Sequence, residues 1–199
     1  LQLVSGGNVN VYWIATYLWD STVFLGLAVA IMLVFASYGR SAAAIFLTPF
    51  DAAIATFLLL VTFGASTIPY NYCATFFFFN HVTAQISILM INFTTGFVAS
   101  MAYLIMSAIE STQDLAEDLR IVFLCFPPYN FGEGLLRLSS SFYSRVILGV
   151  SVEIFSWDIV GCSLTFMTAE ALVYFLVTLC LETPAARHFA HWIDQQRVA

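Results

Sequence analysis

Residues 52–80 read AAIATFLLLVTFGASTIPYNYCATFFFFN, and residues 82–109 read VTAQISILMINFTTGFVASMAYLIMSAI. Neither stretch contains Asp, Glu, Lys or Arg, and only His81 separates them. Each is longer than the roughly 20 apolar residues that an α-helix needs to cross a bilayer. A helix on the surface of a soluble protein keeps a polar stripe for water, and these stretches offer none. The sequence therefore predicts a multi-pass integral membrane protein.

The composition of the whole chain agrees with a membrane location. It is 61% hydrophobic and 9% charged, with a mean hydropathy of +0.90, whereas ordinary globular domains carry about 25% charged residues. The six basic residues are all Arg, so the formal charge of -6 reflects scarce cations more than an acidic surface. Because no basic stripe is present to neutralise phosphates, a nucleic-acid partner is not expected.

Four hydrophobic spans meet the length criterion, at about residues 11–38, 50–77, 82–109 and 159–181. Pro69 interrupts the second span, and because proline removes a backbone donor we expect it to bend or end that helix. Four crossings predict an all-α membrane protein with both chain ends on the same side. The chain opens on Leu1 without an initiator Met, so we expect it to come from the interior of a longer protein.

A different kind of segment, from about residue 119 to 145, precedes the last span. Its first part, residues 121–126, is apolar but too short to cross a bilayer, and Pro127 and Pro128 follow it. The return part begins at Gly132 and is amphipathic. A short apolar arm, a Pro-Pro corner and a glycine-flanked return predict a re-entrant or interfacial helical hairpin. The alternative is an ordinary surface loop with an apolar patch.

Glu170 lies near the middle of the last span. Because an ionised carboxylate at that depth costs several kcal/mol, its side chain should face protein or a water-filled cavity. Tyr174, one helical turn further on, is the hydroxyl partner we expect for it. Glu170 then either lines a substrate path or gate, or makes a structural hydrogen bond between helices.

Asp20 and Asn92 are two further polar residues inside predicted spans. Asp20 lies in the outer third of the first span, where it reaches interfacial water, caps a neighbouring helix or lines a pathway. Asn92 begins the string Asn-Phe-Thr, which matches a glycosylation acceptor. A site in the hydrocarbon core cannot be glycosylated, so we interpret Asn92 as an interhelical hydrogen-bonding group.

The remaining motifs favour packing over chemistry. Two pairs of small residues spaced four apart, Gly96 with Ser100 and Gly26 with Ala30, predict faces where helices approach closely. Cys125 and Cys162 flank one loop and pair only if that side is oxidising; free thiols are the preferred interpretation. The sequence contains no phosphate-binding glycine-rich loop, nucleophile–base pair or metal-ligand cluster. We therefore assign no catalytic, cofactor-binding or metal-binding residue.

Three stretches in a fixed order carry a resemblance to a known family. They are LQLVSG at 1–6 with YW at 12–13 and LWD at 18–20, FPPYNFGEGL at 126–135, and SWDIVG at 156–161 with Met167, Glu170 and VYF at 173–175. They resemble, in turn, the entry to the third transmembrane helix, the exofacial helical hairpin and the last transmembrane helix of ABC transporters of subfamily A. One departure is Glu133, which stands between the hairpin glycines where members often carry Arg.

The resemblance implies that residues 1–199 are the C-terminal four helices of one six-helix transmembrane domain. It implies that residues 1–10 are cytosolic, that residues 110–156 lie outside and that the tail 183–199 returns to the cytosol. The implied partners are membrane lipids, together with a second transmembrane domain and a nucleotide-binding domain in the same polypeptide. ATP and Mg would bind in that nucleotide-binding domain.

The function that the resemblance implies is ATP-driven movement of lipids across or out of the membrane. Glu170, Asn92 and Asp20 are then candidate polar groups along the lipid pathway. The main alternative is a non-transporting multipass scaffold or channel subunit. A multipass membrane enzyme using Glu170 and Asp20 as acid–base groups is less favoured, because no second catalytic group is predicted beside either carboxylate.

Overall fold

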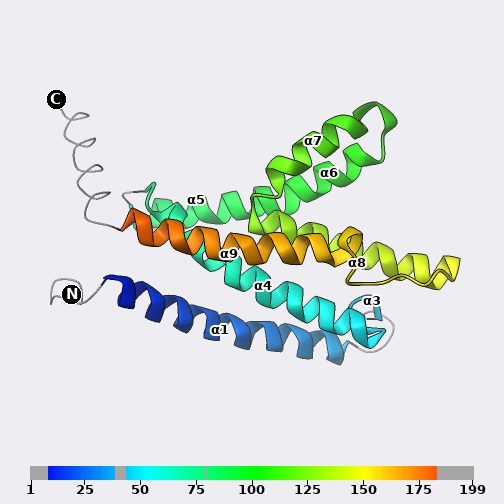
Figure 1. The fold of residues 1–199 in the computed structure, drawn as a ribbon, viewed down its shortest axis with the longest axis horizontal. Coiled ribbons are helices and arrows are strands. Elements are labelled where there is room, and N and C mark those ends of the chain that lie inside the picture. The colour runs from blue at the N-terminus through cyan, green and yellow to red at the C-terminus, as the bar shows by residue number, and fades with distance from the viewer. Residues whose placement is uncertain (1–8, 39–43, 79, 183–199) are drawn as a thin grey trace.

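The computed structural model describes residues 9–38, 44–78 and 80–182, and every regular element in these ranges is helical. Four long helices dominate the fold (Figure 1): α1 (Val9–Ser37), α4 (Phe50–Thr75), a continuous helix made of α5 (His81–Phe93), η1 (Thr94–Val98) and α6 (Ala99–Ser107), and a last helix made of η3 (Trp157–Gly161) and α9 (Cys162–Leu181). All four are long and apolar enough to cross a membrane. The prediction of an all-α membrane protein with four spans is confirmed.

Helix α4 is the centre of the bundle. It packs most extensively against α9, and it also packs against α1 and α8. The short helix α3 (Ala44–Leu47) precedes α4 in the chain. The buried face of α4 is rich in small residues, including Ala52, Ala55 and Gly64, which allow helices to approach closely in a membrane. Pro69 does not end the helix, because α4 continues to Thr75.

The third crossing changes direction where its helical hydrogen bonding changes. Residues Thr94–Val98 form a π-helical turn between α5 and α6, and Figure 1 shows α6 leaving the line of α5. Such turns are a recognised cause of helix kinks. Gly96 lies in this turn, and a methyl group placed on it would lie 3.0 Å from Cβ of Pro128.

The predicted helical hairpin consists of α7 (Gln113–Phe123) and α8 (Pro127–Leu148), preceded by η2 (Glu110–Thr112). The acidic stretch before residue 119 is helical too, so the first arm begins earlier than expected. The two prolines occupy the first turn of α8 instead of the non-helical corner. In the first turn of a helix the N–H that proline lacks has no intrahelical partner, so its absence costs nothing. The corner lies deep in the bundle beside α9, and α8 runs outward from it (Figure 1).

The two pairs of small residues have different outcomes. A Cβ on Gly132 of α8 would lie 2.5 Å from Oγ of Ser100 and 3.0 Å from the carbonyl oxygen of Gly96. The Gly96–Ser100 face is therefore a close contact with α8, as expected. Gly26 has no atom within 4 Å of the equivalent position, so the expected close approach at Gly26 and Ala30 is not formed among the described residues.

Large apolar side chains cover the outer faces of α1 and of the α5–α6 helix. Among those more than half exposed are Leu18, Val23, Leu27, Leu33, Val82, Ile86, Leu89, Phe93, Phe97 and Ile105. An apolar surface of this size would promote aggregation in water, whereas lipid solvates it favourably. The protein is an integral, multi-pass membrane protein.

Candidate functional site

Glu170 connects the middle of the last crossing to the hairpin. Its side chain is 7% exposed, and its Oε2 accepts a hydrogen bond of 3.0 Å from Nδ2 of Asn130, a residue with no exposed surface. The same Nδ2 also donates to the carbonyl oxygen of Leu124 at the hairpin corner. Glu170 therefore bonds α9 to the buried end of α8.

The expected partnership between Glu170 and Tyr174 is wrong. The Tyr174 hydroxyl donates instead to the carbonyl oxygen of Cys125 at 2.5 Å, and its ring packs edge-on against Tyr70 of α4. The expectation considered only residues on one helix face, whereas both side chains reach across to the hairpin. The corner of the hairpin is thus bonded at two successive turns of α9.

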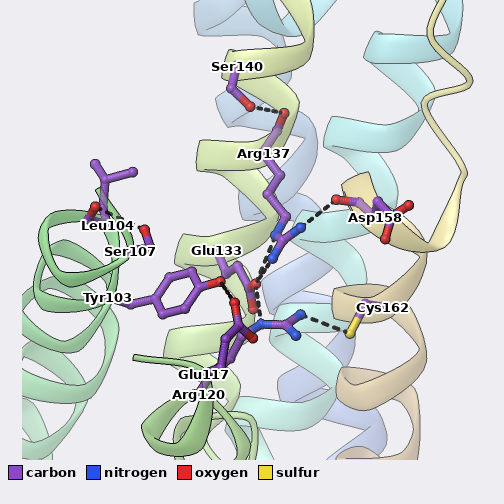
Figure 2. Close-up of polar contacts among 10 residues, drawn as sticks. All are labelled: Tyr103, Leu104, Ser107, Glu117, Arg120, Glu133, Arg137, Ser140, Asp158 and Cys162. Carbon is purple, nitrogen blue, oxygen red and sulfur yellow. Dashed lines mark hydrogen bonds and ion pairs between the residues drawn. The ribbon is translucent and has the colours of Figure 1, made fainter. Parts of the chain in front are cut away.

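A second set of polar contacts surrounds Glu133, the residue between the hairpin glycines (Figure 2). Its side chain is 3% exposed, and its Oε1 lies 2.8 Å from Nε of Arg120 on α7 and 2.8 Å from Nε of Arg137 on α8. The two Arg side chains are 20% and 29% exposed. This Arg120–Glu133–Arg137 cluster joins the two arms of the hairpin and carries a net positive charge.

The two Arg side chains also reach the start of the last crossing. Nη1 of Arg137 donates to the carbonyl oxygen of Asp158 at 2.7 Å, and Nη2 of Arg120 lies 3.5 Å from Sγ of Cys162. Burial lowers the pKa of Arg120, but the charge and hydrogen bond of Glu133 outweigh it, so the pKa rises above its ordinary value. Through these contacts the cluster ties the hairpin to the beginning of α9.

Between α6 and α8, beside this cluster, lies a cavity of about 430 Å³. We call it the α6–α8 cavity; its lining residues are Ser100, Tyr103, Leu104, Ser107, Tyr129, Glu133, Leu136, Arg137, Ser139, Ser140 and Tyr143. Its size falls within the range of small-molecule sites. The Tyr103 hydroxyl donates to Glu117 of α7 at 3.1 Å. Burial and the nearby Glu133 charge raise the pKa of Tyr129, which therefore keeps its proton.

Asp20 and Asn92 bond to consecutive residues near the C-terminal end of α4. Asp20 accepts a hydrogen bond from the hydroxyl of Tyr72, and Asn92 donates to Oδ1 of Asn71 at 3.0 Å. The interhelical role expected of Asn92 is confirmed. Asp20 and Asn71 also line a cavity of about 310 Å³ between α1 and α4. The structure does not bring Glu170 together with these two residues; no hydrogen bond joins the two groups within the described ranges.

Sequence reasoning missed Asn130 and the Arg120–Glu133–Arg137 cluster. One signal was present, because Glu133 and Arg137 are spaced four apart, as ion pairs on a helix often are. Arg120 is on another helix and could not be assigned from spacing. The four cysteines within the described residues, including Cys125 and Cys162, are free thiols.

No group of three or more His, Cys, Asp or Glu in the described part of the chain is placed to hold a metal ion. The polar side chains of the site instead join the hairpin and α9 by hydrogen bonds and ion pairs. Comparison with known proteins decides the family. The model of the family described as "ABC-2 family transporter protein" matches residues 1–180. The chain belongs to the ABC-2 transporter family.

Relatives within this family are members of the ABC transporter subfamily A, which confirms the resemblance. The chain is 31% identical over 189 residues to ATP-binding cassette sub-family A member 7 of Rattus norvegicus, covering 92% of the chain and 8% of the relative. It is 32% identical over 190 residues to sub-family A member 2 of Homo sapiens, covering 90% and 8%. It is 30% identical over 205 residues to the retinal-specific phospholipid-transporting ATPase ABCA4 of Homo sapiens, covering 98% and 9%.

This ABC-2 family chain thus spans less than a tenth of the length of these relatives. The similarity reaches from the first crossing to the last, and so includes the hairpin and the helix of Glu170. The chain is a membrane domain of an ABC transporter, and at least one similar protein is named a phospholipid-transporting ATPase.

Proposed function

We propose that this chain forms the last four helices of one six-helix transmembrane domain in an ATP-driven lipid transporter. In this proposal the hairpin faces the exterior, and the tail at 183–199 leads in the cytosol toward a nucleotide-binding domain that binds ATP and Mg. Family membership and the names of the subfamily A relatives support the assignment. The exposed apolar faces of α1 and α5–α6 are surfaces along which a lipid can move without leaving an apolar solvent.

The observation that carries the mechanism is the attachment of the hairpin to α9. The corner is bonded to α9 through Asn130–Glu170 and through Cys125–Tyr174, and the Arg120–Glu133–Arg137 cluster bonds the hairpin to the start of the same crossing. Any movement that ATP hydrolysis imposes on the cytosolic end of α9 is therefore passed to the hairpin. A hairpin moved in this way changes the exofacial surface that a lipid meets.

The polar residues divide between two roles in this mechanism. Glu170 is buried against Asn130 and transmits movement. Asp20 and Asn71 line the cavity between α1 and α4, where they are placed to meet a polar lipid head group, and Asn92 orients Asn71. A carboxylate and an amide facing an intramembrane cavity are characteristic of substrate paths.

The test is ATP-driven lipid movement by the full-length protein in proteoliposomes. A fluorescent phosphatidylcholine in both leaflets is treated with a membrane-impermeant quencher, and the protected fraction is measured with Mg-ATP and with a non-hydrolysable ATP analogue. We expect the protected fraction to change only with Mg-ATP. Equal fractions in both conditions, together with an intact fold, would contradict transport and favour a scaffold.

A further inference from the structure

The α6–α8 cavity holds unpaired hydrogen-bonding groups that nothing else in the described chain uses. The hydroxyls of Ser100 and Tyr129 and the Oε2 of Glu133 are buried without a hydrogen-bond partner among the described residues. Tyr129 has no exposed surface, and Ser100 is 2% exposed. Buried polar groups are nearly always paired, so each of these atoms indicates a missing partner.

Arg137 adds charged donors to this inventory. A guanidinium has five N–H groups. In Arg137, contacts with Glu133 engage Nε and Nη2, and the Asp158 carbonyl oxygen engages Nη1. Two N–H groups remain, and the side chain is 29% exposed on the lining of the cavity.

The unused groups are therefore mostly donors. They comprise two N–H groups of Arg137 and the buried hydroxyls of Ser100 and Tyr129, all of which can donate, whereas the Oε2 of Glu133 is the one unpaired atom among these groups that can only accept. The Arg120–Glu133–Arg137 cluster is net positive, whereas the carboxylate of Glu117 is outside the lining and already accepts from Tyr103. A ligand rich in acceptor oxygens and negatively charged fits such a site, and phosphate has both properties.

The rest of the lining is apolar. Leu104, Leu136 and the tyrosine rings face the same space. Leu104 of the lining is itself 48% exposed, and the next residue, Ile105, is 60% exposed on the outer apolar surface of α6. A free phosphate ion would leave this surface uncovered, whereas a lipid would place its acyl chains along it.

We propose that the α6–α8 cavity binds the phosphate group of a membrane phospholipid, with Arg137 as the main contact and the hydroxyls of Ser100, Tyr129 and Tyr143 around it. The proposal rests on the proposed function only for the identity of the ligand as a membrane lipid. The site is placed at the hairpin, so it is distinct from the cavity lined by Asp20. Movement of the hairpin with α9 would open or close it.

The experiment uses the full-length protein, delipidated in detergent, and a phosphatidylcholine carrying a photoreactive head group. After irradiation, labelled peptides are identified by mass spectrometry. We expect labelling of residues 99–107 and 136–143, blocked by unlabelled phosphatidylcholine but not by a diacylglycerol with the same chains or by inorganic phosphate. Equal competition by the diacylglycerol would overturn phosphate recognition, and equal competition by inorganic phosphate would overturn the lipid assignment.

Variants separate binding from folding. R137Q removes the charged donors, and we expect labelling about tenfold weaker. R145Q removes a charge from the same helix but not from the cavity lining, so it should keep the label. S140W fills the cavity from an exposed position and leaves every charge in place, so it should also abolish labelling. Undiminished labelling in S140W would refute the site even if R137Q misfolds.

The outcome is separable from that of the proposed function. Absence of labelling in a protein that still moves lipid with Mg-ATP would refute the cavity and leave transport standing. Labelling of the cavity in a protein that never moves lipid would support the site and contradict transport.

Discussion

At the scale of single residues, the partner of Glu170 is the main correction to the sequence-based interpretation. Its depth in the membrane followed from its place in the span, because hydrophobicity and helix length fix depth. Its partner did not, because Asn130 belongs to a separate helix that returns into the bundle. Periodicity within one helix pointed to Tyr174, which bonds elsewhere.

Replacing Glu170 by Gln tests whether its charge serves function. Gln keeps a carbonyl acceptor for Asn130, so we expect the unfolding temperature in detergent to stay near that of the wild type. We expect the rate of Mg-ATP-dependent lipid movement to change several-fold, because a neutral amide accepts a weaker hydrogen bond from Asn130 than a carboxylate does and so couples the hairpin less firmly to α9.

The matched variant is Glu170→Leu, which removes the acceptor and leaves a buried amide N–H unpaired. That loss should lower the free energy of unfolding by about 1–3 kcal/mol. Wild-type transport in Glu170→Gln combined with instability in Glu170→Leu would reduce Glu170 to a packing role.

The cluster around Glu133 could be predicted only in part. Helical spacing suggests the pair of Glu133 with Arg137, but the contribution of Arg120 depends on how the hairpin folds back. The resemblance alone pointed to a lost positive charge at Glu133. The structure shows that two Arg side chains surround that carboxylate, so the site remains net positive.

At the scale of elements, the four crossings and the hairpin followed from the sequence, whereas their packing did not. Long uncharged stretches determine spans because unpaired backbone is not tolerated in lipid. The π turn at Thr94–Val98 had no signal in the apolar pattern, and its Gly96 lies against Pro128 of α8, a contact between segments far apart in the sequence. Small-residue spacing predicted one true contact, at Gly96 and Ser100, and one at Gly26 that the structure lacks.

The close contact of α8 with α6 leads to a prediction about Gly132. A Cβ there would lie 3.0 Å from the carbonyl oxygen of Gly96 and closer still to Ser100, so Gly132→Ala should push the hairpin away from α6. We expect a loss of about 1–3 kcal/mol in stability, as for overpacked cores, measured as a lower unfolding temperature in detergent.

The control is Gly26→Ala, a helical glycine whose added methyl meets nothing within 4 Å. It should be neutral or stabilising by up to about 1 kcal/mol, because Ala favours helix over Gly. Replacing Ser100 by Gly in the Gly132→Ala background should restore part of the loss. A Gly132→Ala protein as stable as Gly26→Ala would contradict the contact.

At the scale of the whole molecule, the positions of the helix ends define the two sides of the bundle. α1 begins and α9 ends at the same end of the bundle, whereas the C-terminal end of α8 lies at the opposite end (Figure 1). With four crossings, successive connections between the spans lie on alternate sides of the membrane. The sidedness itself comes from the family resemblance, because the few Arg residues give no clear charge bias.

The measurement that tests this most directly is cysteine accessibility in intact cells. Cys73, Cys125, Cys162 and Cys180 are first replaced by Ala in the full-length protein. Single cysteines are then introduced at Ser111, Asn80 and Gln195 and exposed to a membrane-impermeant maleimide. We expect labelling at Ser111 in intact cells, and labelling at Asn80 and Gln195 only after permeabilisation. Labelling of Asn80 in intact cells, or equal labelling of Ser111 and Gln195, would contradict the four-crossing arrangement.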